Sequence, residues 1–246
     1  MKNDADIEQF QYSQIQNYPY ERWFREVRYS GKTLTETERK EFLAASEKVI
    51  ASYSRGLPLI TSQLERSKEL HDEYHEIYRT LLSVMLFTLL IVIDCIVACK
   101  LFMMADKDYD RRFTRGKMKI ILNEGFKKLY GFDEKTHKKS EWNRLATILK
   151  YFPEKIQKQY QELSSLLEEQ SKSSSWWKDE RDLETHLDAE KLYASRCEDV
   201  IESKVMTDSI KLINALFAEY AFLTNINACV FNFLLETYRR GELREK

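Results

Sequence analysis

The run RDLETH at positions 181–186 brings together side chains that can act on a phosphate group. A histidine can accept or donate a proton near neutral pH. An arginine can bind a phosphate and stabilise the negative charge that develops on it. Asp182 precedes His186 by four residues, so on a helix the two would share a face and the carboxylate could orient the imidazole. The run predicts a candidate catalytic site made of Arg181, Asp182 and His186.

The spacing limits how this site could work. Arg181 and His186 are five residues apart, which is a rotation of about 140° on a helix, so one helix cannot easily turn both toward one phosphate. A second helix related by two-fold symmetry would supply the missing group. The alternative, which we favour on spacing alone, is a solvated helix face beside Trp176 and Trp177. An Arg at the same distance from a His recurs at Arg66 and His71, without the Asp.

Two histidines offer a different chemistry. His71 and His75 are four residues apart and would share a helix face, as two ligands of one metal must. With His186 or Asp182 from another helix they could complete a metal site inside a bundle. The favoured alternative is a surface pair at the start of an apolar helix, so we predict no bound metal and no cofactor.

Any contact with RNA would have to use a local basic patch, because the net charge of the chain is only −1. The main basic cluster follows Asp110. Its members that are predicted to bind RNA or phosphate are Arg111, Arg112, Arg115, Lys117 and Lys119. The alternative is an ordinary solvated face, balanced by the aspartates that precede it.

Glycine and proline, which helix interiors tolerate poorly, are scarce in this chain. Only six Gly and three Pro occur in 246 residues, and neither type occurs between Glu154 and Arg240. We therefore predict an all-α protein with one bundle of about six or seven helices. The predicted organisation is an aromatic-rich N-terminal arm over residues 1–32 and a helical domain over residues 33–246.

Local signals predict the helix boundaries. Thr35 and Glu38 form a capping-box pattern that begins a helix. Gly56 is expected to end that helix near residue 54, and Pro58 to begin a long helix that reaches residue 105 with a kink or break inside it. The remaining helices are expected over residues 106–130, interrupted or bent at Gly116, and over residues 140–152, 153–171, 176–203 and 206–239.

The most apolar segment runs from Leu81 to Met104, and only Asp94 and Lys100 interrupt it. About 20 apolar residues are enough to cross a membrane, so membrane insertion is one possibility. We favour a central helix of a bundle, because a second apolar stretch, Leu212–Leu235, is available as its partner. In that setting Asp94 is expected to form a buried ion pair.

Two further features concern the compartment and the N-terminal arm. The four cysteines show no CxxC spacing, and the polar N-terminus lacks the apolar core of a secretory signal, so we predict a reduced, cytoplasmic protein. The arm is expected to contain a short helix near residues 20–29 and to dock on the body through its aromatic residues: Phe10, Tyr12, Tyr18, Tyr20, Trp23, Phe24 and Tyr29.

An Arg, then a polar residue, then three residues and a His, on a helix of an all-α protein, resembles the signature of the HEPN superfamily, a group of helical-bundle proteins. The resemblance covers residues 181–186 and the fold class. It implies RNA cleavage without a metal, in a bacterial defence or toxin system, by a homodimer with Arg181 and His186 as the catalytic pair. The alternative is a non-enzymatic helical module that binds a protein partner, either as a soluble protein or at a membrane through Leu81–Met104.

Overall fold

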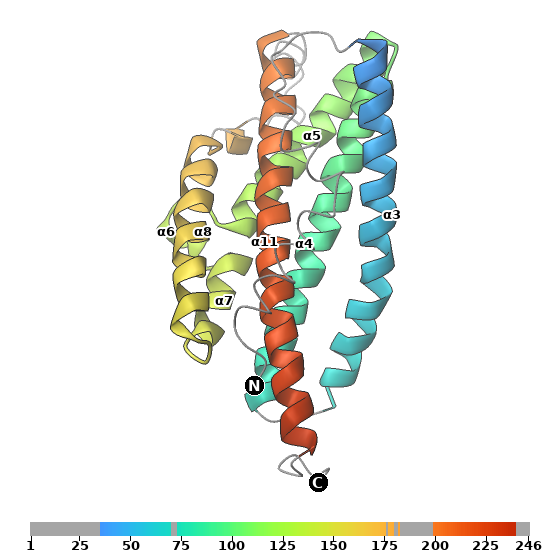
Figure 1. Ribbon diagram of the computed structural model, residues 1–246. Coiled ribbons are helices and arrows are strands. Elements are labelled where there is room, and N and C mark those ends of the chain that lie inside the picture. The colour runs from blue at the N-terminus through green and yellow to red at the C-terminus, as the bar shows by residue number, and fades with distance from the viewer. Residues whose placement is uncertain (1–34, 70–72, 176, 180–181, 183–198, 240–246) are drawn as a thin grey trace.

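The computed structural model describes residues 35–69, 73–175, 177–179, 182 and 199–239. Within these residues the secondary structure is helical, without a strand, and the prediction of an all-α bundle with a long central apolar helix is confirmed. The predicted N-terminal arm lies outside the described residues. The helices, labelled as in Figure 1, are α3 (Glu36–Ser67), α4 (Glu73–Met104), α5 (Asp108–Leu129), α6 (Glu134–His137), α7 (Glu141–Leu149), α8 (Glu154–Ser173) and α11 (Asp199–Arg239).

Helix α3 begins where the sequence predicts but continues further. The Glu38 backbone N–H donates to Thr35 Oγ1 at 3.3 Å and the Thr35 N–H donates to the Glu38 carboxylate at 2.8 Å, which completes the capping box. The prediction that Gly56 and Pro58 separate two helices is wrong, because α3 runs through both. Tyr53 and Ile60 are buried on either side of them. This burial offsets the hydrogen bond that Pro58 cannot make.

The break expected within residues 58–105 lies between Ser67 and Glu73, where the chain turns back and α4 packs along α3. Arg79 of α4 donates to the Ser67 carbonyl oxygen at 2.5 Å and so satisfies a carbonyl that the end of α3 leaves exposed. The Tyr78 hydroxyl donates to Gln63 Oε1 at 3.1 Å. The predicted long helix is therefore two arms of a helical hairpin.

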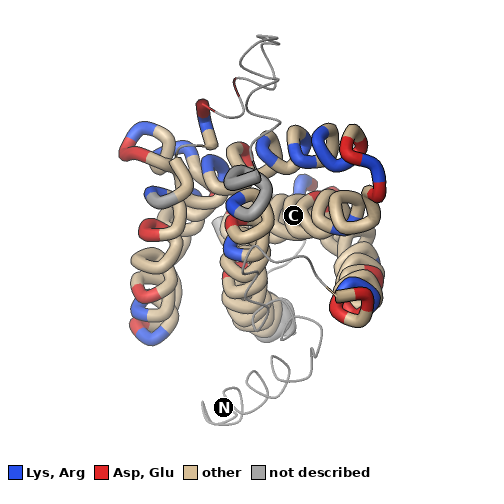
Figure 2. The backbone as a smooth tube through the Cα atoms, turned by 90° about the horizontal axis from the view of Figure 1, so that it is seen from above, with Lys and Arg blue, Asp and Glu red and all other residues tan. Residues whose placement is uncertain are grey.

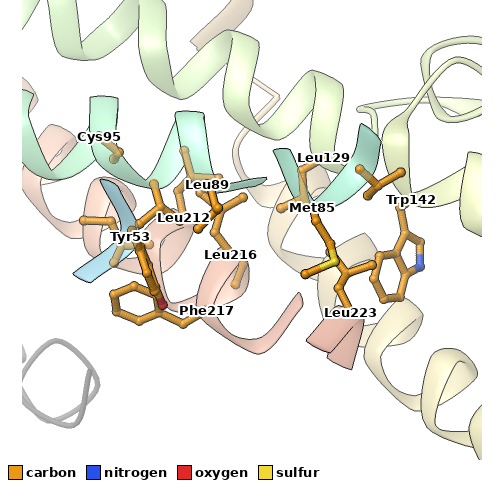
Figure 3. Packing of buried hydrophobic residues seen from close by; sticks show 14 of the residues in the cluster. Tyr53, Met85, Leu89, Cys95, Leu129, Trp142, Leu212, Leu216, Phe217 and Leu223 are labelled. Carbon is orange, nitrogen blue, oxygen red and sulfur yellow. The ribbon is translucent and has the colours of Figure 1, made fainter. Parts of the chain in front are cut away.

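Helix α4 is the centre of the bundle and packs against α3, α5, α7 and α11. In Figure 1 it lies between α3 and α11, and Figure 3 shows side chains of α4 meeting those of α11 in the core. Among the described helices it is the one long and apolar enough to cross a membrane, and 56% of its most apolar 18-residue window is buried. These contacts support the central-helix interpretation of Leu81–Met104.

Two glycines determine how closely α5 packs on α11 and where α5 ends. Gly125 lies against Leu212 of α11, and a Cβ added at Gly125 would come within 2.6 Å of the Leu212 side chain. Gly131 has a φ of 94°, which other residues rarely adopt, and its N–H donates to the Phe126 carbonyl at 3.0 Å to end the helix. The helix is not interrupted at Gly116, because α5 is continuous from Asp108 to Leu129, so of the interruption or bend predicted there the interruption is wrong.

Two short helices, α6 and α7, connect α5 to α8. The predicted loop 131–139 contains α6, which Asp133 and Thr136 cap reciprocally. Ser140 caps α7 as predicted, accepting from the Asn143 N–H at 3.1 Å. At the other end of the bundle, α11 begins at Asp199, so the predicted helix boundary between residues 203 and 206 is wrong.

Candidate functional site

The structure describes one of the three residues of the predicted catalytic site. Asp182 is helical and partly buried. Arg181 and His186 lie outside the described residues. The distance between their side chains is thus untested, and the site stays a prediction.

The chain just before that site is fixed to the bundle. Trp177 is completely buried, and its indole Nε1 donates to Asp208 Oδ2 of α11 at 2.9 Å. Asp208 is 2% exposed and also accepts from Lys211 Nζ at 3.1 Å. Both of its oxygens are therefore hydrogen bonded, as a buried carboxylate requires. Asp182 is five residues beyond this anchor.

The predicted basic cluster does not form one solvent-facing track. Arg115 is 4% exposed and Lys119 is completely buried, and both have interactions inside the protein. Arg111 is partly buried and stands over the Phe102 ring at 5.1 Å. Arg112 pairs with Asp108 at 2.6 Å. Lys117 is the member classed as exposed, over the ring of Phe113 at 5.2 Å.

The charges on the other described helices are also mixed in sign. Figure 2 shows positively and negatively charged positions interspersed over the outside of the bundle. Several basic residues of the outer helices pair with acidic residues one turn away, as Lys138 does with Glu134 at 2.7 Å. Over the described residues, this pairing weakens the positive field that would attract a phosphate backbone.

The histidines within the described residues are His75 and His137. No group of three or more potential metal ligands occurs in the part of the chain that the structure describes. His71 lies outside it. The His137 ring stacks on Tyr130 with centroids 4.3 Å apart, and its Nδ1 is 2.8 Å from the Tyr130 carbonyl oxygen. His137 therefore has a packing role at the turn that Gly131 makes.

The two charges of the apolar helix have different surroundings from those predicted. Asp94 is exposed on the outer face of α4, so the prediction of a buried ion pair is wrong. Partial burial among apolar neighbours raises the pKa of its carboxyl above the usual value. Lys100 forms an ion pair with Glu47, which ties α4 to α3.

A buried acid that the sequence marks only as an interruption of the second apolar stretch lies between α4 and α11. Glu219 is completely buried. Its Oε2 is 3.1 Å from Thr88 Oγ1, which is also 2.9 Å from the Val84 carbonyl oxygen. A hydroxyl has one hydrogen, and when Thr88 donates it to Val84 the remaining contact needs a proton on Glu219.

Electrostatics agree with a protonated Glu219. Burial, and to a smaller extent the nearby charge of Glu141, raises the pKa of this carboxyl from 4.5 to about 8, although the Thr88 contact lowers it. At neutral pH Glu219 is thus a neutral acid that joins α4 to α11. Within the described part of the chain Glu219 has no exposed surface, so we assign it to the core.

A space that can hold a ligand lies on another face of α11. A cleft of about 470 Å³ separates α8 from α11. This volume is in the range of ligand-binding pockets. From α8 it is lined by Gln159, Glu162, Leu163 and Leu166, and from α11 by Asn214, Phe217, Ala218, Ala221, Phe222 and Asn225.

The cleft exists because aromatic side chains set the spacing of the two helices at one end. Trp142 of α7 stacks on Tyr160 of α8 with centroids 4.6 Å apart and planes 7° apart, and both rings pack against Phe222. The Trp142 indole also donates to Ser164 Oγ at 2.7 Å. Beyond these packed rings, the residues of α11 that face α8 are Ala218 and Ala221. Their side chains are too small to reach α8.

The chemistry of the cleft is that of a groove for apolar side chains. Its walls are leucine, phenylalanine and alanine, and Leu166 is 43% exposed at its edge. Amide side chains lie at intervals along it, and Glu162 is the charged residue among those that line it. Sequence reasoning missed this site. Its signal is the run of small and aromatic residues at helical spacing on α11.

No family model matches this chain, and no curated protein and no solved structure matches it significantly. The candidate site is therefore interpreted from its own geometry.

Proposed function

We propose that this protein is a helical interaction module that binds an amphipathic helical segment of a protein partner in the α8–α11 cleft. The observation that carries the proposal is the cleft itself, about 470 Å³ between two helices, with apolar walls and a polar rim. A helix that lays its apolar face in a hydrophobic groove is a recurrent mode of peptide recognition.

The lining residues support a helical ligand in particular. Ala218 and Ala221 have small side chains, which allow a third helix to approach α11 closely. Phe217 and Phe222 provide aromatic contact area, the kind of surface on which binding hot spots concentrate. The amides of Asn225 and Gln159 can bond polar groups at the edge of the ligand.

The test is photo-crosslinking in the cells that express the protein, with p-benzoylphenylalanine in place of Leu166. We expect a protein partner to be linked at Leu166 and not at Leu101, which is 54% exposed on α4. Ala221→Arg should abolish the link, because it places a charge in an apolar cleft. The matched control is Ala228→Arg on an exposed turn of the same helix, which should leave the link intact.

A second function, metal-independent RNA cleavage by a dimer, stays a proposal on the resemblance of residues 181–186. Burial of Arg115 and Lys119 does not favour it, because neither can contact RNA at the surface.

Its test is cleavage of a mixed RNA pool, in the presence of a chelator, by the wild-type protein and by His186→Ala. Cleavage that disappears in the variant would support general acid–base catalysis by His186. Cleavage that persists in the variant would assign it to another residue or to a contaminant. Absence of cleavage by either protein would leave the interaction module as the proposed function.

A further inference from the structure

We infer that the partner helix bound in the α8–α11 cleft carries a basic residue on each side of an apolar anchor, within two helical turns. The inference rests on the proposed function, because it names the class of partner that the same cleft selects. Two features of α8 support it. These are the order of side chains along the edge of the cleft, and two carboxylates on that edge that pair with no cation of the described residues.

The α8 edge of the cleft has an apolar residue between two acids. Glu162 and Leu166 line the cleft, and Glu169 follows one turn later. The three positions are i, i+4 and i+7, which lie on one side of a helix. All three side chains are exposed. A helix in the cleft therefore meets a carboxylate, an alkyl group and a second carboxylate in that order.

The two acids of this edge differ from a neighbouring acid that has a partner on α8. Glu168 pairs with Lys172 at 2.5 Å, so this lysine is engaged away from Glu169. Lys158 precedes Glu162 by four residues, which is the less favourable order for a helical pair. Throughout the part of the chain that the structure describes, neither Glu162 nor Glu169 forms a side-chain ion pair or hydrogen bond. Both carboxylates are thus available to a ligand.

The opposite edge of the cleft leaves the sign of the charge to α8. Helices α8 and α11 lie side by side and run in opposite directions (Figure 1). Among the lining residues, which all belong to described helices, those of α11 are apolar or amide side chains. A helix that lies along the cleft therefore has its basic residues toward α8 and its apolar residues toward Ala218 and Ala221.

The spacing of the acids fixes the spacing of the basic residues. Seven residues of a helix rise about 10 Å, so a partner helix along the cleft matches Glu162 and Glu169 with basic residues at i and i+7. The anchor that covers Leu166 then lies at i+3 or i+4. A bound helix also removes water from both carboxylates, which is unfavourable unless a cation compensates. Apolar contacts supply affinity, and the charges select among amphipathic helices.

The experiment measures binding of designed helical peptides to the purified full-length chain by fluorescence anisotropy. Each peptide has about 16 residues, enough to form a helix, and has leucines as apolar anchors. The positions i and i+7 beside the anchors carry lysine in one peptide and glutamate in the other. We expect the lysine peptide to bind roughly tenfold more tightly, as two exposed ion pairs allow. High salt should reduce this ratio, because it screens exposed charges.

Charge reversal on α8 identifies the residues that select the peptide. Glu162→Lys combined with Glu169→Lys should reverse the preference, so that the glutamate peptide binds more tightly. The matched control is Glu41→Lys combined with Glu76→Lys, which makes the same change in net charge at exposed positions of α3 and α4. This control should keep the preference for lysine.

Equal affinity for the two peptides, a preference for glutamate, or a preference that the control also reverses would overturn the inference. Failure of the inference remains distinguishable from failure of the proposed function. Equal binding that Ala221→Arg abolishes would refute selection by charge and keep the cleft as a helix-binding site. Absence of binding by both peptides, or binding that Ala221→Arg does not change, would contradict the cleft as the site and so refute both.

Discussion

Helix α11 has two faces that differ in how tightly neighbouring helices pack against them. Toward α4 and α5 its side chains fill the space completely, and Leu212, Leu216 and Leu223 have no exposed surface (Figure 3). Toward α8 the same helix leaves a cleft of about 470 Å³. The first face has large aliphatic residues and the second has alanines between phenylalanines. The difference shows how one helix can hold a fold together and still leave a place for a ligand.

The largest effect is expected from Leu216→Ala on the packed face. Leu216 is completely buried, so its truncation removes apolar contacts and leaves a cavity. We expect a loss of about 4 kcal/mol in the free energy of unfolding, measured by urea denaturation. A loss below about 1 kcal/mol would mean that this face is no better packed than the cleft.

The second effect is a dependence of the free energy of unfolding on pH, caused by Glu219 on the packed face. Below pH 4.5 Glu219 is protonated in both the folded and the unfolded chain. Between pH 4.5 and about 8 the unfolded chain releases this proton while the folded protein keeps it, so stability falls as pH rises; above about 8 the loss is complete. Each pH unit in this window lowers stability by about 1.4 kcal/mol.

Glu219→Gln removes this titration and keeps the side-chain shape. Relative to wild type, the variant should gain on the order of 3 kcal/mol of stability between pH 5 and pH 8. Urea unfolding of both proteins at the two pH values measures it. Thr88→Val is the companion variant, since it removes the hydroxyl that contacts Glu219 and leaves the acid in place. An equal pH dependence in wild type and Glu219→Gln would contradict a protonated, buried acid.

A smaller effect is expected from Gly125→Ala, where α5 packs on α11. The added methyl group would meet Leu212 at 2.6 Å, so Leu212 must change its side-chain conformation. We expect a loss of about 2 kcal/mol, in the range of overpacking. Gly125→Ala combined with Leu212→Ala should recover part of it, and a double variant no better than the sum of the singles would refute steric conflict as the cause.

The smallest effect is expected on the cleft face. Ala221→Leu adds three carbon atoms, but the cleft has room for them. The free energy of unfolding should change by less than about 1 kcal/mol, while partner crosslinking at Leu166 should weaken. A loss as large as that of Leu216→Ala would remove the distinction between the two faces.

The fold class follows from the sequence because it depends on composition and periodicity. Scarce Gly and Pro and two long apolar stretches are enough to predict a helical bundle around a central helix. The boundaries at Gly56, Pro58 and residues 203–206 do not follow, because tertiary burial overrides local breakers. The turn at Ser67 is set by Arg79, which comes twelve residues later.

The burial of two basic residues shows how a site prediction can mislead. Arg115 and Lys119 fall at helical spacing with Met118, Leu122 and Phe126, all of them buried on one face of α5. That spacing is visible in the sequence and favours burial of both basic residues. The cleft is a different matter, because its width depends on the Trp142–Tyr160 stack between α7 and α8. No local pattern encodes such a distance.

The most direct test of the cleft as a binding site is photo-crosslinking from Leu166 in the cells that express the protein. We predict a protein partner linked at Leu166, absent at Leu101, lost in Ala221→Arg and kept in Ala228→Arg. Equal links from Leu166 and Leu101, or a link at Leu166 that Ala221→Arg does not change, would contradict binding in the cleft.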